Sequence, residues 1–257
     1  MRYAFSLVEL SIVLVILGLL TGGILAGKSL IRAAELRSVS TEYQRYTSAV
    51  YAFRDRYFAL PGDMTNATSV WGKDATNCNG NTGNPNTPGT CNGNGDGLIS
   101  LSGVVGGTVE AYQAWKQLAL AGLVEGSYTG LGGGPTISTE GALGVNRPAS
   151  RAGGGAGWGL FYYGTISSHF AISDNAYGNA FVFAGDFPGT SPYHYVITPE
   201  EAWNIDTKLD DGKPQTGKIW AIFWALCTTA ASSSAINGDY KLTETNAYCS
   251  LIWPKMF

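Results

Sequence analysis

The hydrophobic pattern separates the first 60 residues from the rest of the chain. A run without any charge extends from Leu10 to Gly27 and, with Phe5–Val8 before it, reaches about the 20 residues that a helix needs to cross a bilayer. From residue 28 onward, apolar residues instead recur three and four positions apart, which is the spacing of one helix face. The Leu60-Pro61-Gly62 sequence ends this pattern, because proline cannot continue a helix and glycine turns the chain. The residues that carry the spacing are Tyr43, Tyr46, Val50, Phe53 and Tyr57.

These patterns predict one helix of about 50 residues. Its first half, 5–27, is apolar all round and needs lipid or other helices around it, whereas its second half, 28–60, is amphipathic and needs a folded domain to lie on. Four glycines in the first half allow two interpretations: close packing of helices through small residues, or a segment that unwinds locally, since each glycine weakens a helix by up to about 1 kcal/mol. These are Gly18, Gly22, Gly23 and Gly27.

The sequence of residues 61–257 predicts a globular domain, called the head below. Residues 73–97 form an Asn/Gly-rich loop that lacks the apolar residues of a regular element, and a helix is predicted over 109–121. Thr-Pro-Glu-Glu at 198–201 has the form of a capping box with proline at the first helical position, which predicts a short helix. Strands are predicted at Gly159–Ile166, His169–Ser173, Ala180–Ala184, Tyr193–Ile197, Lys218–Cys227 and Ala247–Trp253. The predicted fold class is α+β: a long N-terminal α-helix with a membrane-embedded first half, packed on an antiparallel β-sheet domain.

Composition narrows the class of protein. The formal net charge is −3, and charged residues make up only 14% of the chain, against roughly 25% in ordinary soluble domains. The 35 glycines fit a loop-rich exported domain. No basic stretch is long enough to neutralise nucleic-acid phosphates, so no nucleic-acid partner is indicated. The even number of cysteines predicts disulfides, and the local pairing Cys78–Cys91 with Cys227–Cys249 is favoured among the three connectivities.

Glu9 stands inside the apolar run, where a carboxylate costs several kcal/mol unless it has a partner. If a peptidase cuts after Ala4, the new α-amine lies on Phe5, four residues from Glu9 and on the same helix face. An α-amine with a pKa of about 8 is mostly cationic at neutral pH. It can therefore pair with Glu9 of its own chain or of a neighbour, and a pair between chains would set the register of the two helices.

The sequence from Ala4 to Leu20, A-FSLVELSIVLVILGLL, resembles the class III signal of type IV pilins and pseudopilins. The resemblance implies that residues 1–4 are a leader removed by a prepilin peptidase on the cytoplasmic side, that Phe5 is then N-methylated, and that Glu9 is used in assembly. Ala4 departs from the glycine that usually precedes the cut in this family. The membrane half also lacks the proline of many type IV pilins, which favours a pseudopilin-like or atypical subunit.

The resemblance implies a pilin-like fold and a structural function. The chain would sit in the inner membrane as a single-pass protein with a cytoplasmic N-terminus, and would then join copies of itself or other pilin-like subunits in a periplasmic or cell-surface filament. An alternative within the same family is a minor pilin or adhesin-type binding subunit. The stretch could instead be a plain signal anchor or a signal peptide cut near Gly27. In the second case the protein would belong to a different class, a secreted enzyme whose mature N-terminus lies near Lys28.

The Cys91–Ser100 segment contains the first half of an EF-hand-like calcium loop. Oxygen-bearing side chains alternate and a glycine follows them, but the twelfth position of the loop is a glycine rather than an acid. Glu110 or Asp74 would have to close the site. A turn-rich loop without metal explains the same residues. The predicted ligands of this candidate structural Ca²⁺ are Asn92, Asn94, Asp96, Leu98 through its backbone carbonyl, and Glu110.

A second acidic group consists of Asp206, Asp210 and Asp211. A helix C-terminus capped by Gly212 is favoured over a metal site there. No enzymatic chemistry is indicated: neither of the two histidines, His169 and His194, lies in a zinc-binding spacing. The chain also contains no G-x-S-x-G sequence and no phosphate-binding loop.

Overall fold

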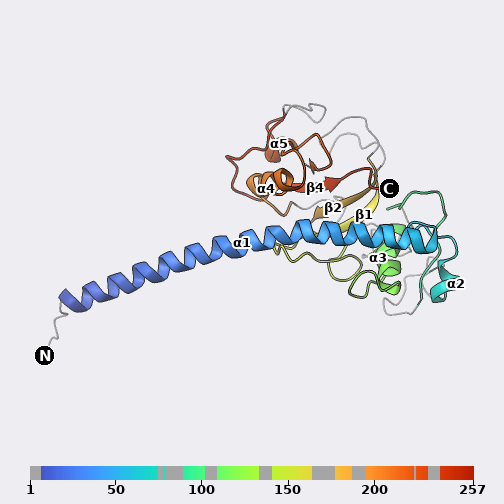
Figure 1. The fold of residues 1–257 in the computed structure, drawn as a ribbon, viewed down its shortest axis with the longest axis horizontal. Helices are drawn as coiled ribbons and strands as arrows, with labels where there is room; N and C mark the ends of the chain where they lie inside the picture. Colours follow the sequence, from blue (N-terminus) through green and yellow to red (C-terminus); the bar gives the residue numbers. More distant parts are fainter. Residues whose placement is uncertain are drawn as a thin grey trace.

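The computed structural model describes residues 7–74, 78, 89–101, 109–132, 141–163, 177–186, 195–222, 224–230 and 238–257. Within these residues, one long helix runs past a head that contains shorter helices and a four-stranded antiparallel sheet (Figure 1). The predicted α+β class is therefore confirmed. The expected cleavage site at Ala4 and Phe5, the predicted strand His169–Ser173, His194 and much of the loop 73–97 lie outside the described residues.

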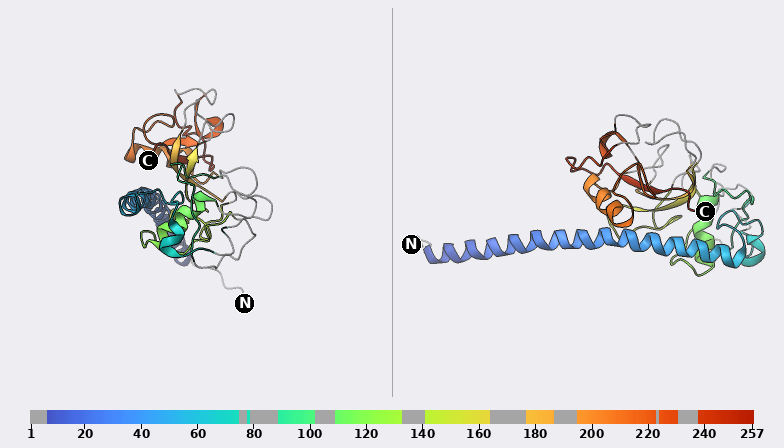
Figure 2. Two further views of the ribbon diagram at one scale, coloured as in Figure 1. Left: turned by 90° about the vertical axis from the view of Figure 1, so that its right-hand side faces the viewer. Right: turned by 45° about the horizontal axis from the view of Figure 1, so that its top comes forward.

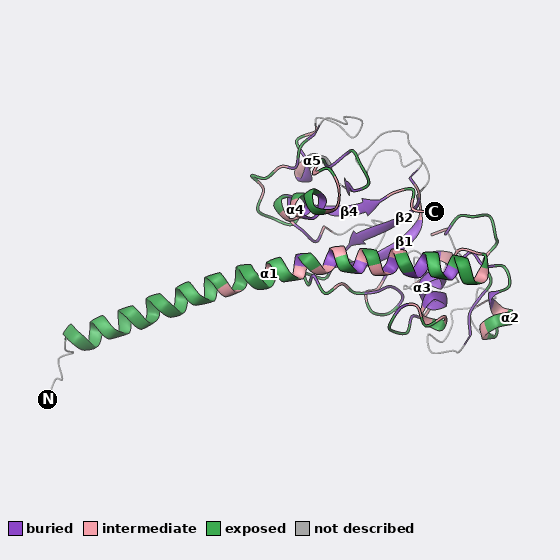
Figure 3. Ribbon diagram, viewed as in Figure 1, coloured by how far each residue is buried: buried purple, intermediate pink, exposed green. Residues whose placement is uncertain are grey.

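The long helix α1 is continuous from Leu7 to Tyr57 and has 51 residues. Its first half stands clear of the head, and its second half lies along it (Figures 1 and 2). Every large apolar residue from Leu7 to Ile31 is exposed (Figure 3). Among the described residues, α1 is the one helix that is long and apolar enough to cross a membrane. The buried residues all lie in the second half: Leu36, Val39, Glu42, Tyr46, Ala49, Val50 and Phe53.

The sheet has the order β1-β2-β4-β3, and every neighbouring pair is antiparallel. Its central strands are rich in aromatic and β-branched residues, as expected for strands in a core, and β2 is buried along all but its first residue. The register sets Trp158 opposite Phe183 and Val182 opposite Ile252. The strands are β1 (Gly157–Tyr163), β2 (Gly178–Ala184), β3 (Trp220–Ile222) and β4 (Ser250–Trp253).

Aromatic rings join α1 to the head. The Tyr43 ring centroid lies 4.9 Å from that of Trp253, and the Tyr46 centroid lies 5.8 Å from that of Trp158. On its other side, Tyr46 meets Trp115 of α3 (Glu110–Leu120) at 5.0 Å. Burial of each large side chain of this kind contributes about 1.5–3 kcal/mol. The second half of α1 is thus part of the core of the head.

Two polar contacts also fix the head along α1. Glu42 is buried, and its carboxylate accepts a hydrogen bond of 2.8 Å from Nε1 of Trp158. Arg32 donates two hydrogen bonds to Glu201, of 2.5 and 3.0 Å. Glu201 also belongs to the capping box at the start of α4 (Pro199–Leu209), so the capped helix predicted at 198–201 is confirmed. The Glu201 carboxylate therefore caps the N-terminus of α4 and also links α4 to α1.

The predicted strand Lys218–Cys227 is wrong over its second part. Among the described residues of this segment, β3, Trp220–Ile222, is the one strand, and Trp224–Cys227 forms a helical turn, α5. Periodicity alone does not distinguish a strand from a helix in a short apolar run. Here the chain must also leave the sheet to bring Cys227 to Cys249, and the Cα atoms of this disulfide are 5.1 Å apart.

Three of the other predicted strands, β1, β2 and β4, are present but differ in length from the prediction. β1 and β2 each begin two residues earlier than predicted. β4 begins at Ser250 rather than Ala247, because the amides of Tyr248 and Cys249 both donate to the carbonyl of Ile197. Within the described part of the predicted strand Tyr193–Ile197, only this isolated pairing is β structure.

The turn that ends α1 depends on Gly62. This glycine has a φ of +86°, a conformation that L side chains rarely adopt, and its N–H donates to Oε1 of Gln117 at 2.7 Å. A Cβ at this position would collide with the carbonyl oxygen of Glu110. The turn therefore brings the end of α1 directly against the start of α3.

We predict that Gly62→Ala lowers the free energy of unfolding by about 2–4 kcal/mol, because left-handed strain adds to a backbone collision. Gly122→Ala is the matched control: its φ is +72° but its Cβ would meet nothing within 4 Å. It should cost only about 1–2 kcal/mol of strain. Urea unfolding of the full chain in a neutral detergent measures both, and equal losses would show that the close approach to α3 is unimportant.

Candidate functional site

Three carboxylates from separate parts of the chain meet in the head. Asp63 follows the turn after α1, Asp96 lies in the Asn/Gly-rich loop, and Glu110 is the first residue of α3. One carboxylate oxygen from each of the three lies within 4.8 Å of the others. Two oxygens on opposite sides of a calcium ion are about 5 Å apart, so this spacing fits calcium coordination.

The loop wraps around these carboxylates with its backbone amides. Asp63, which is 5% exposed, accepts hydrogen bonds from the amides of Gly95 at 2.6 Å and Gly97 at 2.9 Å. Glu110 accepts one from Asn94 at 3.0 Å and one from Ser100 at 3.0 Å. An ionised carboxylate has about four acceptor positions, so each group keeps capacity for a cation.

The charge balance at Glu110 also bears on cation binding. Burial raises the pKa of the Glu110 carboxyl, the amides of Ser100 and Asn94 oppose this shift, and the charges of Asp63 and Asp96 add to it. A bound cation would favour the ionised form of all three groups.

The predicted ligands divide into two sets. Asp96 and Glu110 meet as expected, and Asn94 lies beside them, donating from Nδ2 to Asp96 at 2.9 Å. The amide of Leu98 donates to Asp96 at 2.8 Å, which places this residue in the same turn. Asn92 is occupied elsewhere, since its Oδ1 accepts from the amide of Thr68 in α2 (Ala67–Trp71) at 2.8 Å.

Asp63 is the acid that the sequence reasoning missed. It stands 33 residues before Asp96, and no local spacing connects the two. Asp74, the other acid considered for closing the site, forms an ion pair of 3.1 Å with Lys116 instead. The only signal for Asp63 was its place directly after the Pro61-Gly62 turn.

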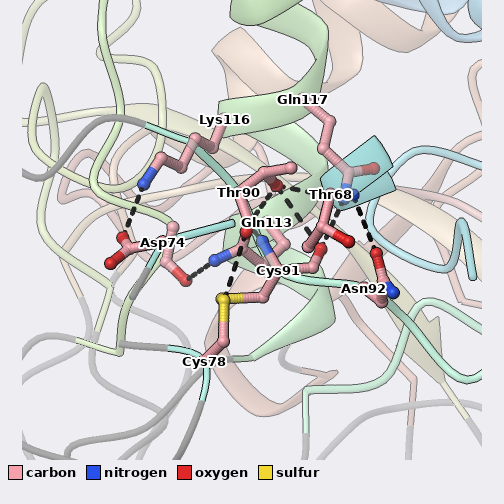
Figure 4. The surroundings of a disulfide bond; sticks show 10 residues. Thr68, Asp74, Cys78, Thr90, Cys91, Asn92, Gln113, Lys116 and Gln117 are labelled. Atoms are coloured by element: carbon pink, nitrogen blue, oxygen red, sulfur yellow. Dashed lines mark hydrogen bonds and ion pairs between the residues drawn. A yellow bond between two sulfur atoms is a disulfide. The ribbon is translucent and has the colours of Figure 1, made fainter. Parts of the chain in front are cut away.

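The polar residues of α3 hold the first part of this loop in place (Figure 4). Gln117 donates from Nε2 to the carbonyl of Cys91 at 3.1 Å, and Gln113 accepts from the hydroxyl of Thr90 at 2.8 Å. The disulfide Cys78–Cys91 lies among these contacts, with Cα atoms 5.2 Å apart. Both disulfides thus have the local pairing that the sequence favoured. The acidic loop is anchored by α3 on one side and by a covalent bond on the other.

The second acidic group has partners of its own. Asp206 accepts from the hydroxyl of Tyr240 at 2.8 Å, and Asp211 accepts from the hydroxyl of Thr216 at 2.6 Å. Asp210 accepts from the amide of Ile219 at 3.0 Å. One oxygen from each acid lies within 4.8 Å of the others, but these bonds place the group at the end of α4, as expected. The predicted cap residue is wrong: Asp210, not Gly212, is the C-cap, and the Gly212 amide donates to Asp206 at 3.3 Å. Burial raises the pKa of Asp206 to about 7, against the opposing effects of Tyr240 and Gly212.

Comparison of the chain with models of protein families, with curated proteins and with solved structures finds no match.

Calcium at the Asp63–Asp96–Glu110 cluster remains a prediction. If it binds, calcium at ten times its dissociation constant stabilises the folded chain by about 1.4 kcal/mol. We expect the unfolding midpoint of the full chain in detergent to rise with millimolar calcium relative to chelator, with a weak affinity like that of extracellular modules, about 10⁻⁴–10⁻³ M.

Asp63→Asn should abolish this rise. Asp55→Asn, at an exposed acid of α1 outside the cluster, should keep it. A wild-type midpoint that does not respond to calcium, or an equal response of the two variants, would show that calcium does not bind at this cluster.

Asp206 should make stability depend on pH. Its pKa is about 7 in the fold against an ordinary value of 3.8, so the folded state holds the proton more tightly than the unfolded state. Stability therefore falls as pH rises from about 4 to about 7 and then stays level. Asp206→Asn should reduce this slope, as measured by urea unfolding at about pH 5 and about pH 8. Parallel pH profiles for the variant and the wild type would contradict the assignment.

Proposed function

We propose that the chain is a structural subunit of a type IV pilus-like or type II secretion pseudopilus-like filament. The observation that carries the proposal is the division of α1: one half is buried in the head, and the other half exposes apolar residues on every side. A soluble monomer rarely exposes apolar patches beyond a few hundred Å². Such a surface calls for lipid before assembly and for neighbouring helices afterwards.

The continuity of α1 supports a role in assembly. Because one unbroken helix joins the apolar half to the core of the head, any packing of the apolar halves also fixes the spacing of the heads. Arg32 and Glu42 lock the head against rotation about this helix. The heads would therefore follow the helical arrangement that the apolar halves adopt.

Glu9 would set the register of this packing. It lies in the first turn of α1, on an exposed part of the apolar half. In the proposed assembly, the leader 1–4 is removed by prepilin peptidase, Phe5 carries a methylated amine, and Glu9 pairs with the Phe5 amine of a neighbouring chain. The subunit is single-pass in the inner membrane, with a cytoplasmic N-terminus, before it joins a periplasmic or surface filament. No catalytic step by this chain is part of the proposal.

A minor pilin or adhesin-type subunit is the second candidate. Phe58, directly after α1, is 92% exposed and has a φ of +53°. A cavity of about 390 Å³ beside it is lined by Arg54 and Asp63, among others. An exposed aromatic ring held in a strained conformation is a feature of binding sites. A binding subunit would be sparse in the filament, and a structural subunit would be its main component.

We predict that Glu9→Gln leaves membrane insertion unchanged but reduces incorporation into sheared filaments at least tenfold, because the register pair is lost. Asp55→Asn is the control, an exposed acid at the opposite end of α1. Quantitative immunoblots of membranes and of sheared material measure both fractions. Normal incorporation of Glu9→Gln would eliminate the register role.

The mass of the N-terminal peptide from the same material tests the pathway itself. A peptide that starts at Phe5 and is one methyl heavier supports the proposal, for the wild type and the variant alike. A mature chain that starts near Lys28 means that the apolar half of α1 is discarded, and the filament proposal then fails.

A further inference from the structure

A basic groove lies at the junction between the exposed and the buried halves of α1. It has a volume of about 290 Å³ and runs between one face of α1 and the loop that leads into β1. Ala34, Ser38 and Thr41 form its small-residue floor on α1. Three arginines line it as well: Arg37 and Arg45 from α1, and Arg151 from the loop.

The groove has an excess of positive charge. Its one acidic residue is Glu42, and the carboxylate of Glu42 is turned to other partners. Oε2 accepts from Ser150 Oγ at 2.6 Å and Trp158 Nε1 at 2.8 Å, and Oε1 accepts from the amide of Arg151 at 2.9 Å. Against three arginines, this single buried carboxylate leaves two positive charges in excess.

The guanidinium groups differ in how they are used. Arg45 donates to the hydroxyl of Tyr46 at 3.1 Å and lies 3.5 Å from Glu125, whose side chain is 82% exposed. Within the described part of the chain, the guanidinium groups of Arg37 and Arg151 make no hydrogen bond or ion pair. Arg32, five residues before Arg37, is by contrast fully engaged with Glu201, Glu35 and the carbonyl of Ala152.

The hydrogen-bond donors that line the groove indicate which class of ligand it can bind. The hydroxyls of Ser38 and Thr41 donate to carbonyls of their own helix, to Glu35 at 2.6 Å and to Arg37 at 3.5 Å. The guanidinium groups are therefore the donors that remain for a ligand. Their planar forks match the oxygens of a phosphoryl group, to which they donate two hydrogen bonds at once.

The position of the groove along α1 identifies the source of the anion. Exposed large apolar residues of α1 continue past the charge-free run, which ends at Gly27, as far as Ile31, and Arg37 lies about 9 Å beyond Ile31 along the helix axis. The headgroup layer of a bilayer extends about 5–8 Å beyond the hydrocarbon. Because side chains on a helix tilt toward its N-terminus, Arg37 reaches back toward this layer.

We propose that the groove binds the phosphoryl group of an anionic membrane phospholipid through Arg37 and Arg151, with Arg45 beside them. The phosphoryl site rests on the groove alone, whereas its lipid source rests on the proposed membrane insertion of α1. The bound headgroup would hold the head at a fixed height above the membrane before assembly.

The test uses the full chain in a neutral detergent, titrated with phosphatidylglycerol or phosphatidylcholine and examined by native mass spectrometry for retained lipid. We expect preferential retention of phosphatidylglycerol, and at least about tenfold weaker retention by the double variant Arg37→Gln/Arg151→Gln. Arg56→Gln/Lys208→Gln is the matched control: it removes the same charge at two exposed positions outside the groove, at the end of α1 and in α4, and should bind like the wild type. Arg37→Lys/Arg151→Lys keeps the charge without the forks and should bind at an intermediate level.

Equal retention of the two lipids, or equal loss in both glutamine variants, would overturn the proposal. Inorganic phosphate is titrated in parallel without lipid. Phosphate binding that depends on Arg37 and Arg151, without lipid retention, would overturn the lipid source. Filament defects in Arg37→Gln/Arg151→Gln without binding of any anion would instead assign the groove to a contact between subunits. Alkaline extraction of membranes tests insertion of α1 separately, so that a failure of the proposed function is distinguished from a failure of this site.

Discussion

The burial of one half of a single helix in the core of the head is the constraint on which the structure depends. Tyr43 and Tyr46 lie against Trp158 and Trp253 of the sheet, and Trp115 of α3 closes the other side of Tyr46. Removing these rings from water supplies the largest part of the favourable free energy at this contact. Since the helix continues without a break, the position of the core also determines the direction in which the apolar half leaves the head.

Two polar contacts fix the position and rotation of α1 against the sheet. Hydrophobic burial is not directional, and by itself it would allow α1 to slide or turn against the sheet. Glu42 bonds to Trp158 in the core, and Arg32 bonds to Glu201 where α1 leaves the head. These two contacts lie ten residues apart on α1, about 15 Å along its axis. Most of the basic groove lies between them and Arg45 lies one turn beyond Glu42, so its α1 arginines are held on a rigid part of the molecule.

The acidic cluster depends on the unusual burial of α3. This helix buries residues of every face, including Gln113, Lys116 and Gln117. Each of the three has a polar partner in the segments before the helix: Thr90, Asp74 and the amide of Gly62. Buried polar groups are stable only when paired in this way. The pairing gives the loop that follows α1 one arrangement, and this arrangement brings Asp63 to Asp96 and Glu110.

The sequence by itself determined the features that depend on neighbours along the chain. The spacing of Tyr43 to Tyr57 and the stop at Pro61-Gly62 predicted α1, and Thr198 to Glu201 predicted the start of α4, because helix faces and caps are made by residues three and four apart. The absence of charge between Leu10 and Gly27 likewise predicted the exposed apolar half of α1.

Tertiary structure alone decided what distant segments do together. Asp63 lies beside Asp96, Asn92 bonds to α2, and Arg151 lines the same groove as Arg37, which is 114 positions earlier. None of these pairings leaves a periodic signal in the sequence. The end of β3 is a further such feature, because the chain leaves the sheet before Cys227, whose disulfide partner is Cys249. Local patterns fix an element because its hydrogen bonds are local, whereas a site made from several elements exists only once their packing has placed them.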